Sequence, residues 1–167
     1  MKNALSVKIE RQLDSFENRE RMNWNEMQPH LQSHDVAIII GPHRSGKTEF
    51  VVQQYGDNSP CIDVNKASKA YSGGNPAILD EEWEEIATRD CPFIAVIDAH
   101  TLRSDDLFTL VEMAVETKKK LYMTCFDIEA IPYSELLSQI CAAKLSLVRI
   151  EMLENKEIYA WSLVGNS

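Results

Sequence analysis

The sequence predicts a three-layer α/β domain, with helices on both faces of a mainly parallel sheet. Runs of consecutive branched apolar residues are typical of parallel strands that are buried on both faces. From residue 35 onwards these runs alternate with helix-forming segments. The 167 residues fit one ordinary domain. We expect a helical appendage over 1–34, the main domain over 35–167 and an antiparallel hairpin at its C-terminal end.

The composition excludes several classes of protein. A net charge of −9 opposes binding to nucleic acid, which requires a basic surface. The longest apolar run is far shorter than the roughly 20 residues that span a membrane. Charged residues near the N-terminus interrupt any apolar core of a signal peptide. We therefore expect a cytoplasmic protein that is not bound to a membrane.

The four cysteines are scattered at positions 61, 91, 125 and 141 and form no CxxC pair. Each lies in or beside an apolar segment, which predicts reduced, partly buried thiols. The same spacing disfavours a structural zinc site.

The first 34 residues carry two helical patterns. Apolar residues at positions 5, 9, 13 and 16 form one stripe, which predicts an amphipathic helix. A second, short helix is expected after Asn23 as N-cap, with Glu26 in its first turn and apolar residues at 24, 27 and 31.

The next segments predict a strand, a helix and a second strand. Residues 36–40 are a continuous branched run, and a helix should begin within 46–48 and continue towards Tyr55. Residues 61–64 form a plausible short strand, and the glycine- and proline-containing stretch 72–76 predicts a loop.

The remaining elements continue the alternation. Helices are expected from Asp80, from Ser104 as a cap with Lys118–Lys120 in the last turn, and from Ser134. Strands are expected over 93–97, which ends at Asp98, and over 121–125. The strand-like runs 145–152 and 157–164 predict the terminal hairpin.

One motif carries specific chemistry, because residues 41–48 match the pattern GxxxxGK[ST] in full. Such a loop wraps backbone N–H groups around a phosphate, so glycine is needed where a Cβ would obstruct the turn. The helix that follows directs its N-terminus at the anion. The predicted phosphate-binding residues are Gly41, Pro42, His43, Arg44, Ser45, Gly46, Lys47 and Thr48.

Through this motif the sequence resembles the P-loop nucleoside-triphosphatase superfamily, over about residues 35–150. The resemblance implies the P-loop NTPase fold, with residues 41–48 as the Walker A motif. It also implies ATP or GTP with Mg²⁺, Lys47 on the β- and γ-phosphates and Thr48 on the metal ion. A guanine-specific NKxD motif is not evident, since 65–68 read Asn-Lys-Ala-Ser, and we therefore expect ATP.

The resemblance also implies a Walker B carboxylate, which holds the Mg²⁺ shell at the end of an apolar strand. Asp98 follows residues 93–97 and fits that place. Thr124, near the end of the next strand, is a candidate for the polar sensor that many members place near the γ-phosphate. Threonine is also common in strands for ordinary reasons, so both readings stay open.

The residue after Asp98 departs from the RecA-like and AAA-like branches, where a glutamate usually activates the attacking water. Ala99 cannot accept a proton, so a hydrolase must find its base elsewhere. Candidates are Glu49, His100 and the pair 105–106, although each also has an ordinary structural role at a helix start or strand end. If only the base is lacking, Ala99→Glu should raise hydrolysis.

Three functions follow from these observations. The first is an ATP-binding protein of the RecA-like type that hydrolyses slowly or with help from a protein partner or oligomer. The second is a nucleoside or nucleotide kinase, because the loop is similar to thymidine kinase loops; that class also predicts an acid beside Asp98 and CxxC pairs, which are missing. The third is a non-catalytic nucleotide-binding module, which Ala99 favours.

Overall fold

The computed structural model describes residues 20–22, 24–42, 45–53, 78, 80–153 and 158–163. The strands are β1 Glu20–Met22, β2 Val36–Ile40, β3 Phe93–Val96, β4 Lys120–Cys125, β5 Leu147–Met152 and β6 Ile158–Leu163. The helices are α2 Trp24–Ser33, α3 Lys47–Val52, α5 Asp80–Thr88, α6 Ser104–Thr117 and α7 Tyr133–Ala142, with short 3₁₀ helices η3 Ala99–Thr101 and η4 Ile128–Ala130.

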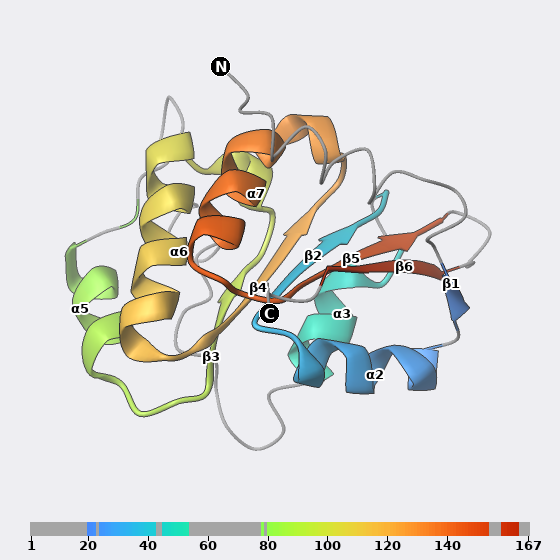
Figure 1. Ribbon diagram of the computed structural model, residues 1–167, viewed down its shortest axis with the longest axis horizontal. Helices are drawn as coiled ribbons and strands as arrows, with labels where there is room; N and C mark the ends of the chain where they lie inside the picture. The colour runs from blue at the N-terminus through green and yellow to red at the C-terminus, as the bar shows by residue number, and fades with distance from the viewer. Residues whose placement is uncertain are drawn as a thin grey trace.

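The described strands form one six-stranded sheet in the order β1-β6-β5-β2-β4-β3 (Figure 1). The four strands β5, β2, β4 and β3 are parallel to one another. Strand β6 pairs antiparallel with β5, and β1 pairs antiparallel with β6. This arrangement confirms the expected α/β class, the mainly parallel sheet and the C-terminal antiparallel hairpin.

Helices cover both faces of the sheet, with α5, α6 and α7 on one side and α2 and α3 on the other (Figure 1). Strand β2 shows why, because all five of its residues are buried. Val36, Ile38 and Ile40 pack in the apolar cluster of α5, α6 and α7. Ala37 and Ile39 pack in the second cluster, with α2 and α3. The alternation of side chains along a strand therefore builds two cores on one sheet.

The ends of α6 differ from the sequence prediction. Ser104 is the first helical residue and not the cap, since Arg103 holds the N-cap position without a side-chain hydrogen bond. The lysines lie beyond the last turn, because Lys118 adopts a left-handed conformation (φ 57°) that ends the helix. Lys120 already belongs to β4, and its ammonium group donates to two carbonyls at the C-terminal end of α2.

The N-terminal segment contributes a strand that the sequence pattern did not predict. Strand β1 has three residues and no apolar alternation, and its pairing with β6 defines it. The short helix expected after Asn23 is confirmed as α2. The helix expected over positions 5–16, the strand 61–64 and the loop 72–76 lie outside the described residues. The domain boundary at residue 34 stays a prediction.

The region around Cys91 corrects the expectation of four reduced thiols. Cys125 and Cys141 are free, whereas Cys91 is disulfide-bonded. Its sulfur lies 3.6 Å from the carbonyl oxygen of Phe93 and, as a disulfide sulfur, has no proton to donate. Spacing along the chain could not predict this, because disulfides depend on distance in space.

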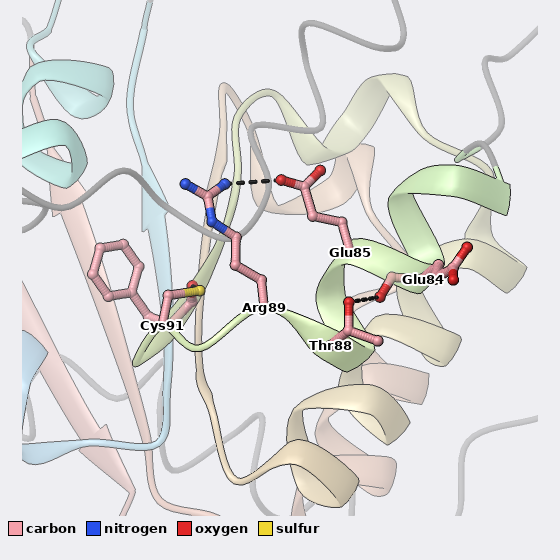
Figure 2. Close-up of polar contacts among 6 residues, drawn as sticks. Glu84, Glu85, Thr88, Arg89 and Cys91 are labelled. Carbon is pink, nitrogen blue, oxygen red and sulfur yellow. Dashed lines mark hydrogen bonds and ion pairs between the residues drawn. The ribbon is translucent and has the colours of Figure 1, made fainter.

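The same region closes the C-terminal end of α5 (Figure 2). Arg89 forms an ion pair with Glu85 at 2.8 Å, and the Thr88 hydroxyl donates to the Glu84 carbonyl at 2.8 Å.

Disulfides are rare in the cytosol, so the cytoplasmic compartment stays a prediction. In the described part of the chain, no helix has both the length and the apolar character needed to cross a bilayer.

Candidate functional site

The loop of the GxxxxGK[ST] motif leaves the carboxyl end of β2, at the centre of the sheet. The Gly41 N–H donates to the Cys125 carbonyl at 3.1 Å, which ties the loop to the end of β4. The Ser45 N–H donates to the Pro42 carbonyl at 3.2 Å, so the chain turns back on itself. His43 and Arg44 lie outside the described residues.

Both motif glycines occupy positions that only glycine fills without strain. A Cβ on Gly41 would lie 2.6 Å from the Ser45 hydroxyl oxygen and 2.8 Å from the Met152 carbonyl oxygen. Gly46, directly before α3, has φ 96° and ψ 9°, in the left-handed region. The two glycines are therefore required by the shape of the loop, independently of any ligand.

Lys47 places its ammonium group over the loop. Its Nζ donates to the Pro42 carbonyl at 2.9 Å, and the residue is only 6% exposed. Burial lowers the pKa of Lys47, while the negative charge of Asp98 opposes that shift. An ammonium group has three donors and this bond uses one, so the group can also hold an anion.

Asp98 follows β3 in an unusual backbone conformation, with φ 58° and ψ 55°. Aspartate tolerates this left-handed region better than most residues, at a cost of about 1 kcal/mol or more. The Asp98 N–H donates to the Thr124 hydroxyl oxygen at 2.9 Å. On its other side, the Asp98 carbonyl accepts the Thr101 hydroxyl at 2.7 Å and the Thr101 N–H at 2.9 Å. Hydrogen bonds from two elements therefore hold this peptide.

Thr48 and Glu49 lie exposed in the first turn of α3. Among the described residues, no three His, Cys, Asp or Glu side chains gather to form a metal site. Mg²⁺ commonly binds with one or two protein ligands plus waters and phosphate oxygens. Thr48 and Asp98 fit that sparse donor set. The buried Ser45 hydroxyl oxygen, which has no hydrogen-bond partner in the described structure, adds a polar group to the loop.

The residue after Asp98 is sealed inside the protein. Ala99 is fully buried in the apolar cluster of α5, α6 and α7. His100 is half-buried and meets Phe126 edge-on, with ring centroids 4.8 Å apart and an interplanar angle of 81°. Phe126 is 48% exposed at the end of β4. Asp106 has a structural contact, because its carboxylate accepts the Ile78 N–H at 3.0 Å.

The structure thus brings the loop and the Asp98 turn together at the carboxyl ends of the parallel strands. Strand β4 lies between β2 and β3, and contacts near its carboxyl end join the loop to the Asp98 turn. The negative charge of Asp98 also raises the pKa of the Lys47 ammonium group, against the larger effect of burial. Nothing in the described residues links Glu49 to the Asp98 turn.

Sequence reasoning missed three contributors: Thr101, Phe126 and the Cys125 carbonyl. A threonine three residues after an aspartate is a recognisable turn signal and could have indicated Thr101. The other two depend on strand order, which the sequence does not reveal.

Comparison with known proteins assigns no family to the chain. No protein-family model matches the sequence, and a search of curated proteins yields no match.

Proposed function

We propose that this protein binds ATP with Mg²⁺ in the loop 41–48, and that any hydrolysis is slow or depends on a protein partner. In this role the backbone amides of the loop and the Lys47 ammonium group bind the phosphates. Thr48 and Asp98 hold the ion, which neutralises charge on the phosphate oxygens when it is bound. The loop and the acid after an apolar strand are the features in which the sequence resembles the P-loop superfamily, and the choice of the RecA-like type rests on the general layout of the chain.

The observation that carries the proposal is the pairing of a glycine-dependent loop with a buried lysine. Neither Gly41 nor Gly46 tolerates a side chain without strain, and both belong to the motif. Burying an ammonium group costs free energy, because the group loses its hydration. Lys47 is nevertheless buried beside the loop, and this burial lowers its pKa. A bound polyphosphate would add negative charge beside this ammonium group, beyond the charge of Asp98.

The direct test is calorimetric titration of the purified protein with ATP and Mg²⁺, comparing Lys47→Ala with Lys119→Ala. Lys119 follows α6 at the opposite edge of the sheet and is the matched control. We expect Lys47→Ala to weaken ATP binding at least about tenfold and Lys119→Ala to leave it unchanged. Equal affinity of both variants and the wild type would refute the assignment. Titration with GTP compares the two bases.

A second candidate, the non-catalytic nucleotide-binding module, is favoured by the burial of Ala99. A phosphate-release assay at saturating ATP distinguishes it from an ATPase. Binding without phosphate release, even with added cell extract, would favour the module. The kinase alternative has no specific contact in its favour, and phosphorylation of thymidine by the purified protein would establish it instead.

A further inference from the structure

The main chain at Asp98 is held by hydrogen bonds on both sides. The peptide N–H and C=O of this one residue take part in three hydrogen bonds, to Thr124 on one side and to Thr101 on the other. Asp98 itself has a left-handed backbone conformation (φ 58°), which residues other than glycine rarely adopt. Strained backbone persists only where surrounding contacts determine it.

Thr124 holds the Asp98 N–H from a rigid position, because it is fully buried in β4. Its hydroxyl oxygen accepts the Asp98 N–H at 2.9 Å, so this oxygen holds the main chain of Asp98 from the side of β4. The adjacent Cys125 carbonyl accepts the Gly41 N–H at 3.1 Å. Two neighbouring residues of β4 thus support the acidic turn and the phosphate loop together.

We propose that Thr124 and Thr101 are positioning residues, which fix the main chain of Asp98 so that its carboxylate is held in one place for a metal–nucleotide complex. The inference rests on the proposed function and deepens it. It assigns the oxygen of the Thr124 hydroxyl to the Asp98 N–H, and the competing role is a direct contact of Thr124 with the γ-phosphate. The two roles predict different losses when the hydroxyl is removed.

The first test uses neither nucleotide nor metal. NMR-detected hydrogen exchange at the Asp98 amide is compared in the wild type, Thr124→Val, Thr124→Ser and Thr109→Val. Valine keeps the shape of threonine and removes the acceptor, so exchange should accelerate at least about tenfold. Serine keeps the hydroxyl and should restore slow exchange. Thr109, whose hydroxyl donates to the Asp105 carbonyl at 2.9 Å within α6, is the control and should have no effect.

The second test separates positioning from phosphate contact. Thr124→Val should weaken binding of ATP with Mg²⁺ about tenfold while leaving ATP binding in EDTA within about twofold. In an Asp98→Asn background, Thr124→Val should cause no further loss, because residues that act through one another are not additive. A residue that touches the phosphate directly would weaken binding in EDTA and would add to Asp98→Asn.

The outcomes are distinguishable. Unchanged Asp98 exchange in Thr124→Val, or equal losses with and without Mg²⁺, overturns the positioning role while the proposed function stands. If the wild type binds no nucleotide, the proposed function fails, and the exchange experiment still shows whether the Thr124 hydroxyl holds the Asp98 main chain. If Thr124→Val does not fold, Thr101→Val tests the hydrogen bonds on the carbonyl side of Asp98. It should give the same pattern with a smaller loss, about threefold, because the Thr101 N–H still donates to the Asp98 carbonyl.

Discussion

At the scale of single residues, Ala99 decides what chemistry the site can perform unaided. If only the catalytic glutamate were missing, the side chain at position 99 would face the space where the phosphate is expected. Instead, its side chain is fully buried among apolar residues. A glutamate there would enter the core of the protein and not the space in front of a phosphate. The sequence-based expectation that Ala99→Glu raises hydrolysis is therefore replaced by a prediction about stability.

We predict that Ala99→Glu lowers the free energy of unfolding by roughly 3 kcal/mol or more, because it buries a carboxylate without a partner. Urea unfolding measures this loss. Ala87→Glu, at an exposed position of α5, is the control and should change stability by less than about 0.5 kcal/mol. A stable Ala99→Glu protein with faster phosphate release would contradict the prediction.

Lys47 provides a second residue-scale prediction, on pH. Burial lowers the pKa of its ammonium group below the ordinary 10.5, and Asp98 only partly opposes this. In the proposed function the protonated form binds phosphate, so ATP affinity should fall as the pH rises through a value below 10.5. Calorimetry across the alkaline range checks this. Affinity that holds constant until the pH exceeds 10.5 would show that burial does not govern this lysine.

At the scale of elements, the junction of β2 with its loop depends on close approach to β5. A methyl group on Gly41 would meet the Met152 carbonyl at 2.8 Å and the Ser45 hydroxyl oxygen at 2.6 Å. The serine can rotate away, but the strand carbonyl cannot do so without disturbing the sheet.

Gly41→Ala should therefore reduce stability by about 1–3 kcal/mol and weaken ATP binding as the loop is displaced. Adding Ser45→Ala removes one of the two clashes, so the double variant should recover only part of the loss. Thermal unfolding and calorimetry measure the two effects. Full recovery in the double variant would mean that the Met152 carbonyl gives no obstruction.

The elements divide clearly into those that sequence could predict and those that it could not. Strands β2 and β3 are uninterrupted apolar runs buried on both faces, so their composition was sufficient. Strand β1 is three residues without such a pattern, and its strand conformation depends on a distant partner, β6. The loop glycines and Lys47 were predicted from one motif. The hydrogen bond from Asp98 to Thr124 was not, because it exists only where β4 lies beside β3.

At the scale of the whole molecule, two buried groups make the fold sensitive to alkali. Burial raises the pKa of Tyr122 from 10.0 to about 12 and that of Cys125 from 9.0 to about 12. Each raised pKa contributes stability that is complete below the unfolded-state pKa and is lost as the pH rises towards the folded-state value. Stability should therefore be constant up to about pH 9 and fall between pH 9 and 12.

Each pKa unit corresponds to about 1.4 kcal/mol, so the expected loss is several kcal/mol. Urea midpoints measured at increasing pH test it, and Cys125→Ala should delay the onset, because it removes the group with the lower ordinary pKa. The same burial should protect the Cys125 thiol from alkylating reagents in the native protein. A midpoint independent of pH up to 12 would argue against both groups.

The packing of α2 has a consequence for how fragments of this protein should be cut. Met27 and Leu31 are fully buried against the same face of the sheet as Phe50, which belongs to the helix after the loop. A truncation beginning at Asp35, where the alternation of strands and helices begins, would remove both side chains. The apolar sheet face that they cover would then be exposed to solvent. Together they represent about 3–6 kcal/mol of burial. Such a shortened chain would fail a nucleotide-binding assay through unfolding alone, so recombinant fragments should retain the residues of this helix.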